Sequence, residues 1–190
     1  MLEIRIKQTK FCLDFTFAAV LAFYFWLDSE GWGVVSIVLC MLHELAHLAV
    51  MCACGISPER ITMYGGGIRI SSSQVESCAG YKKLAIYSAG CAVNFILCAV
   101  LFSFQRNAAI LSLFMGIFNL LPIGEFDGAQ LLKCLLIKFC PPERIDAVMR
   151  AVGVITVILC GVIIAAVQGQ VSITLLSAVL YLTIVVLHDM

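Results

Sequence analysis

The sequence predicts an all-α polytopic membrane protein of about six transmembrane helices, with a short β-hairpin or re-entrant loop after the second helix. Two observations carry this prediction: 62% of the residues are hydrophobic and only 13% are charged, and long apolar runs alternate with short polar stretches. Soluble domains are about 45–50% apolar and about 25% charged, so a water-soluble enzyme and a disordered chain are excluded. The formal net charge of zero leaves no basic surface for nucleic acid.

Six apolar runs match or approach the length of a spanning helix, which needs about 17–25 mainly apolar residues. They are Phe11–Leu27, Gly33–Cys54, Leu84–Phe104, Ala108–Leu121, Val148–Val167 and Val171–Leu187. The fourth run is short. The segment GAQLLKCLLIKF that follows it is expected either to extend that helix or to form a separate amphipathic one.

The lysines and arginines predict the orientation, because cytosolic loops carry an excess of them. Of the 12 basic residues, all but Arg106 and Arg150 lie before the first run, between the second and third, or between the fourth and fifth. Arg150 lies at the start of the fifth run, on the same side as the preceding loop. This segregation predicts a multi-pass protein of the plasma membrane with both termini in the cytosol. The first run lacks a small-residue cleavage site, so we expect it to be retained as a span.

Three ionisable residues, His43, Glu44 and His47, lie in the middle of the second run, VLCMLHELAHLAVMC. Each such group costs at least about 2.5–3.5 kcal/mol at that depth and usually marks function. Residues i and i+4 share one helical face, so the two imidazoles can chelate one Zn²⁺, and Glu44 can act as a general base toward a water on the metal. The alternative is a pair of histidines hydrogen-bonded inside a helix bundle, with Glu44 protonated.

A polar break, FNLLPIGEFDGAQ, follows the fourth run and contains candidates for a further metal ligand. A catalytic zinc ion takes three protein ligands and leaves one position open, and irregular backbone at membrane depth lines a cavity or is buried in protein. Asp127 or Glu125 can supply the third ligand, and spacing alone does not choose between them. His188, the remaining histidine, lies at the end of the last run. The alternative is a helix-ending turn at the membrane surface.

The loop after the second run contains RITMYGGGIRI, in which β-branched residues flank Gly65, Gly66 and Gly67. This pattern predicts a short hairpin or re-entrant loop. An extended peptide could add to the edge of such a hairpin as a further strand. The alternative is a structural loop at the membrane surface.

The two polar motifs resemble those of the site-2 proteases, which are intramembrane zinc metalloproteases. The family's HExxH motif appears as HELAH (His43–His47), and its Asn/Pro…Asp-Gly motif as NLLPIGEFDG (Asn119–Gly128). A glycine-rich stretch, YGGGIRI (Tyr64–Ile70), and a small-residue segment, GCAVN (Gly90–Asn94), resemble two further family features. In the latter segment Cys91 stands where the family usually has proline.

The resemblance covers about residues 35–135. In layout the chain is similar to the bacterial branch that includes the protease processing a sporulation sigma-factor precursor, without the CBS domain common in that branch. It implies a single membrane-embedded metalloprotease domain over 1–190, with a catalytic core at about 33–138 and two C-terminal spans at 148–187.

The resemblance also implies the site and the reaction. One Zn²⁺ per chain would be held by His43, His47 and Asp127, with Glu44 as the base. Asn119 would stabilise the oxyanion or bind substrate, with helix capping as its alternative role. The implied activity is cleavage of membrane-embedded or membrane-associated proteins within the lipid bilayer, as in regulated intramembrane proteolysis. A homo-oligomer and a regulatory membrane protein are both left open as partners.

Two other functions use the same residues. Intramembrane His, Glu and Asp could carry protons or divalent cations in a transporter, although no paired inverted repeats are evident. A catalytically inactive scaffold that binds a membrane partner is the second alternative, and the presence of every expected ligand and of the base weighs against it.

Overall fold

The structure is a computed structural model that describes residues 2–6, 9–28, 30–65 and 67–168. The chain divides into two compact units, Met1–Ile117 and Phe118–Met190, each of which is described by itself. The elements of the first unit are β1 (Leu2–Ile6), β2 (Thr9–Leu13), α1 (Phe15–Leu27), α2 (Trp32–Ala53), β3 (Arg60–Tyr64), β4 (Gly67–Ser71), α3 (Ser73–Ser77), α4 (Gly80–Leu101) and most of α5 (Arg106–Asn119). The second unit contains α6 (Asp127–Leu136) and α7 (Pro142–Gln168).

The four strands form one sheet in the order β1-β2-β3-β4. Antiparallel pairing joins β1 to β2 and β3 to β4, and parallel pairing joins β2 to β3. The hairpin predicted after the second apolar run is therefore confirmed. The expectation of an all-α chain is corrected, because the N-terminal segment forms a second hairpin that pairs with the first.

The sheet also shortens the first predicted span. Residues Phe11 to Leu13 pair with Ile61 to Met63 of β3, and α1 begins only at Phe15. Asp14 caps this helix, because its carboxylate accepts the Thr16 N–H at 2.9 Å. The 13 residues of α1 span about 20 Å at 1.5 Å per residue, which is less than the roughly 30 Å of a bilayer core.

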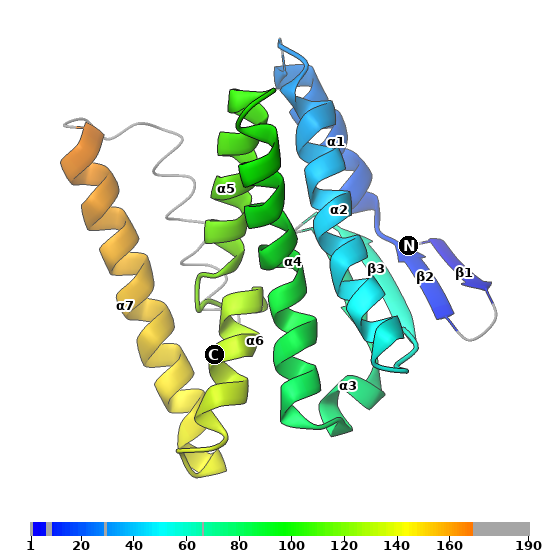
Figure 1. The fold of residues 1–190 in the computed structure, drawn as a ribbon, viewed down its shortest axis with the longest axis vertical. Coiled ribbons are helices and arrows are strands. Elements are labelled where there is room, and N and C mark those ends of the chain that lie inside the picture. The colour runs from blue at the N-terminus through cyan, green and yellow to red at the C-terminus, as the bar shows by residue number, and fades with distance from the viewer. Residues whose placement is uncertain (1, 7–8, 29, 66, 169–190) are drawn as a thin grey trace. The chain divides into compact units, whose positions relative to one another are not determined.

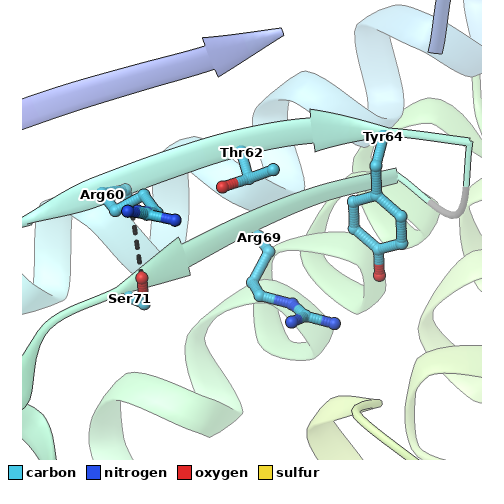
Figure 2. A pocket seen from close by; sticks show the side chains of 5 residues that line it. All are labelled: Arg60, Thr62, Tyr64, Arg69 and Ser71. Carbon is cyan, nitrogen blue, oxygen red and sulfur yellow. Dashed lines mark hydrogen bonds between the residues drawn. The ribbon is translucent and has the colours of Figure 1, made fainter. Parts of the chain in front are cut away.

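The β3–β4 hairpin has one polar face and one apolar face because side chains alternate along a strand. Figure 2 shows the polar face, where Arg60, Thr62 and Tyr64 of β3 lie beside Arg69 and Ser71 of β4. The Arg69 guanidinium lies 5.3 Å from the centroid of the Tyr64 ring. On the opposite face, Ile70 packs against a buried cluster that includes Met51 and Ile86. The hairpin is thereby held against α2 and α4.

Helices α2 and α4 run side by side and make the most extensive helix–helix contact of the first unit (Figure 1). The end of α2 is closed by Gly55 at φ +76°, whose N–H donates to the Cys52 carbonyl while Ile56 N–H donates to Met51. This left-handed glycine cap satisfies carbonyls that the helix would leave unpaired. Lys82 of α4 donates to the Cys54 carbonyl at 2.9 Å, which ties the two helices together.

Within the described residues, three helices are long and apolar enough to cross a membrane: α2, α4 and the Pro142–Val162 part of α7. The mostly helical membrane class is therefore supported, whereas six spans are not confirmed. Helix α5 has 14 residues, so it too is shorter than a full span. The sixth predicted run, Val171–Leu187, lies outside the described residues.

The second unit begins with a turn that leads into α6. Ile123 and Val157 are buried against each other, with Leu121 and Phe126 packed around them. Helix α6 starts at Asp127 and is separated from α5 by a segment without regular helix. The segment GAQLLKCLLIKF therefore contributes to a separate helix, which was one of its two predicted forms.

Candidate metal centre

The two histidines of the HExxH motif lie on the buried face of α2. His43 is 4% exposed and His47 is 8% exposed, and Leu39 and Met51 continue the same buried face one turn away on either side. The spacing of four residues in a helix brings the two rings together, with their centroids 4.8 Å apart. The predicted sharing of one face is confirmed.

The His47 ring is fixed by the backbone of α4. Its Nδ1 lies 2.7 Å from the Ile86 carbonyl oxygen, which can only accept a hydrogen bond. Nδ1 therefore carries the proton, and Nε2 is left with its lone pair. This is the tautomer that a metal-binding histidine adopts when its second nitrogen donates to a carbonyl.

The two Nε2 atoms converge. His43 Nε2 and His47 Nε2 are 3.2 Å apart. A tetrahedral zinc ion with Zn–N bonds of about 2.0–2.1 Å holds two nitrogen ligands about 3.3–3.4 Å apart. The separation of the two imidazoles therefore fits two corners of a zinc coordination sphere.

Gly90 of α4 provides the space that these rings occupy. A Cβ built on Gly90 would lie 2.5 Å from His43 Nε2 and would also collide with His47 Nε2. Any side chain at this position would displace the two Nε2 atoms. The absence of a Cβ at Gly90 is therefore a requirement of the site rather than of the helix.

His43 is held on its other side by Asn94, one helical turn beyond Gly90. The Asn94 amide nitrogen lies 3.0 Å from His43 Nδ1, and Asn94 is fully buried. Ser112 of α5 donates to the Asn94 backbone carbonyl at 2.9 Å. Both imidazoles thus have a partner on α4 at the nitrogen that faces away from their shared point.

Glu44 follows His43 in α2 and is half-buried. One residue along a helix turns the side chain by about 100°, so Glu44 flanks the histidine face rather than lying within it. Its assignment as the base stays a prediction, because it follows from the motif and its chemistry.

The other expected site residues lie in the second unit. Asn119 ends α5, and Asp127 is the first residue of α6. Asp127 is half-buried whereas Glu125 is exposed. A Cβ on Gly128 would collide with the Leu120 backbone, so this glycine allows α6 to approach the chain that precedes the turn. Gly124, at φ +53°, allows the turn that precedes α6.

The glycine-rich loop forms the tip of the β3–β4 hairpin. Gly65 donates its N–H to Thr16 Oγ1 at 3.0 Å, and Gly67 opens β4 with φ +128°. Gly66 and His188 lie outside the described residues. The proposed contact of this loop with substrate stays a prediction.

The sequence predicts no role in the site for the residues of α4. Gly90 and Asn94 are the ends of a small-residue segment, and the Ile86 carbonyl is a backbone group without a sequence signal. One signal was present: Gly90 and Asn94 have the same i, i+4 spacing as His43 and His47. When two predicted spans each carry a pair of residues with this spacing, the helix faces that hold the two pairs are expected to pack against each other.

A convergent imidazole pair on α2, buried against the apolar helix α4, defines the class as a membrane protein with a candidate metal centre. Peptidase family M50 matches residues 103–160, a range that includes Asn119 and Asp127 but not the two histidines. The putative zinc metalloprotease Rip3 of Mycobacterium tuberculosis, in strains Erdman and H37Rv, is 28% identical over 134 residues, covering 60% of this chain and 33% of that protein. The chain thus spans about a third of the length of these relatives.

The fold is similar to that of a solved site-2 protease. The structure of the site-2 protease from Methanocaldococcus jannaschii aligns with a TM-score of 0.67 at 20% identity, covering 99% of this chain and 94% of that chain. Together with the M50 match and the zinc metalloprotease relatives, this confirms the resemblance to the site-2 proteases.

Gly90→Ala is expected to lower zinc affinity by at least the 10- to 100-fold typical of damage to the surroundings of a metal ligand, because the added methyl group displaces both Nε2 atoms. Gly80→Ala is the matched control in the same helix, since a Cβ there would meet no atom within 4 Å. Zinc titration against a chelator in detergent measures both. Equal affinities in the two variants would contradict this account of Gly90.

Proposed function

We propose that the chain is an intramembrane zinc metalloendopeptidase that cleaves membrane-embedded or membrane-associated proteins. The observation that carries this proposal is the 3.2 Å separation of two imidazole nitrogens at a point on α4 that has no side chain. Ionisable groups in spanning helices are costly and mark function. The M50 match and the zinc metalloprotease relatives favour peptide hydrolysis over ion transport.

We assign Asp127 as the third zinc ligand, with one ion per chain. His43, His47 and Asp127 each offer one ligand atom of a type that zinc accepts. The half-buried position of Asp127 favours it over the exposed Glu125, and so does the family motif. Two histidines and one carboxylate leave the open position that a catalytic zinc needs.

Zinc, when bound, supplies a Lewis acid that lowers the pKa of a water molecule and stabilises negative charge on the scissile carbonyl oxygen. The residues of this chain provide the remaining parts of the reaction. Glu44 takes a proton from the attacking water and returns it to the leaving amine. Asn119 donates a hydrogen bond to the developing oxyanion or to the substrate backbone.

The histidines lie near one end of α2, which places the proposed site near one side of the membrane. His47 lies six residues before the end of α2 at Ala53, which is about 9 Å along the helix axis. The sheet and the Lys82 contact lie at this same end. We propose that this end is cytosolic in the plasma membrane, as the basic residues predict, and that both termini lie on that side.

Glu44→Gln is expected to abolish cleavage while zinc stays bound, because the amide cannot accept a proton and the three ligands are unchanged. The measurement is truncation of co-expressed single-span membrane proteins, with zinc content determined on the purified enzyme. Glu76→Gln, an exposed acid on α3, is the matched control and should cleave normally. Undiminished cleavage by Glu44→Gln would remove the proposed base.

His43→Ala, His47→Ala and Asp127→Ala are each expected to lose stoichiometric zinc, whereas Glu125→Ala should retain it. Each alanine removes one of three ligands, and two ligands hold a catalytic zinc ion poorly. Metal analysis of the purified variants measures this. Loss of zinc in Glu125→Ala with retention in Asp127→Ala would reverse the choice of carboxylate. Zinc transported across vesicles without any peptide cleavage would favour a transporter.

We further propose that an unwound substrate adds as a strand beside β4. A helical substrate hides its carbonyls in hydrogen bonds, so it must be extended to be cleaved. Strand β4 is an outer strand of the sheet, and β1 is the other. Met63 pairs with Ile68 of β4, and its carbonyl accepts a hydrogen bond from the N–H of Asp14, the residue that follows β2. Because the backbone groups of Met63 face β2, the Ile68 N–H is directed toward the outer side of β4, since these groups alternate along a strand.

Ile68→Pro is expected to reduce cleavage and leave zinc content unchanged, because proline removes the N–H available for pairing. Arg5→Pro is the matched control in the other outer strand. Arg5 pairs with Lys10, whose N–H donates to Glu59 beside β3, so the Arg5 N–H also faces away from the neighbouring strand. Rates of substrate truncation and zinc content are measured on both variants. Equal cleavage rates would argue against strand addition at β4.

A further inference from the structure

The Asn94 side chain is the partner of His43 at the nitrogen that faces away from His47. Its Nδ2 atom lies 3.0 Å from His43 Nδ1, and the residue is 0% exposed. Its Oδ1 atom has no hydrogen-bond partner among the residues that the structure describes. The Asn94 amide therefore forms a hydrogen bond through its nitrogen, while its oxygen is able to accept another.

In the orientation that the structure shows, the Asn94 side-chain amide belongs to a chain of hydrogen bonds that is complete without a metal ion. Asn94 Nδ2 donates to His43 Nδ1, which requires the His43 proton to be on Nε2. That proton points at His47 Nε2, 3.2 Å away, and His47 Nδ1–H donates to Ile86. Every ring nitrogen is satisfied in this arrangement.

A zinc ion changes the requirement at His43. Coordination through Nε2 needs the lone pair there, so the proton must be on Nδ1, and Nδ1–H needs an acceptor. A half-turn of the Asn94 amide exchanges its nitrogen and oxygen and places Oδ1 at Nδ1. This rotation breaks no hydrogen bond at Oδ1, since that atom has none among the described residues.

We propose that Asn94 is a positioning residue of the metal centre, whose Oδ1 accepts the His43 Nδ1–H when zinc is bound and whose Nδ2 donates to Nδ1 when it is not. This inference rests on the proposed metal site at His43 and His47. It explains why an amide occupies this buried position: it can accept or donate, whereas a carboxylate can only accept and an apolar side chain can do neither.

The backbone around Asn94 is held in place, so the amide can turn while the helix stays fixed. Ser112 Oγ donates to the Asn94 carbonyl. A Cβ on Gly116 would lie 3.2 Å from the Asn94 Cβ, so α5 approaches α4 closely at this point. A ligand held by a rigid support keeps its geometry.

The test compares two substitutions that separate accepting from donating. Asn94→Leu provides neither and is expected to weaken zinc binding by 10- to 100-fold, the usual loss when a ligand's supporting hydrogen bond is removed. Asn94→Asp can accept from Nδ1–H but cannot donate, and it is expected to bind zinc as tightly as the unmodified protein or more tightly. Affinity is measured by chelator competition in detergent.

Ser88→Ala is the control for a change elsewhere in α4. It removes a hydrogen bond to the Ala85 carbonyl of the same helix and leaves the Asn94 amide and both rings unchanged, so zinc affinity should stay the same. If Asn94→Asp loses as much affinity as Asn94→Leu, or if Asn94→Leu loses none, the proposal is wrong.

Nitrogen-15 NMR of histidine-labelled protein reads the tautomer directly, since the sequence has only 3 histidines. The zinc-bound protein should show His43 protonated at Nδ1, both unmodified and as Asn94→Asp. A zinc-bound His43 protonated at Nε2 would overturn the role of Asn94 while leaving the metal centre standing. An unmodified protein that binds no zinc would overturn the metal centre itself.

Discussion

The structure depends on one constraint: imidazoles placed inside apolar helices must have every ring nitrogen paired. His43 and His47 are almost fully buried, and an unpaired polar group there costs about 1–3 kcal/mol. Helix α4 meets this need with a backbone carbonyl at Ile86 and an amide at Asn94, and it contributes no side chain at Gly90. The close packing of α2 on α4 is thus set by the chemistry of two side chains.

The same helix pair determines where the sheet lies. The Schellman-type end of α2 brings Ile56 onto Met51, and the buried cluster there extends to Ile86, whose carbonyl holds His47. The β3–β4 hairpin packs on this cluster through Ile70. The end of α2 nearest the histidines therefore joins the membrane helices to the sheet, and a peptide held by β4 would lie in the same unit as the imidazole pair.

Much of this chain follows from its sequence because the signals are local. Helical periodicity alone places His43 and His47 on one face, and the β-branched residues around Gly65 predict the hairpin. The N-terminal hairpin could not be predicted in this way. Residues Phe11 to Leu13 are apolar enough to begin a span, and only their pairing with β3, about 50 residues later in the chain, places them in a strand.

What the sequence determined by itself is the chemistry: two imidazoles at helical spacing with a carboxylate beside the first, in a run apolar enough to cross a bilayer. Only the tertiary structure decided which atoms of the rings face each other, because that depends on what α4 places beside them. Gly90 leaves room for two Nε2 atoms, while Ile86 and Asn94 engage the two Nδ1 atoms. A backbone carbonyl has no sequence signature, so its effect on a tautomer appears only when the helices are packed.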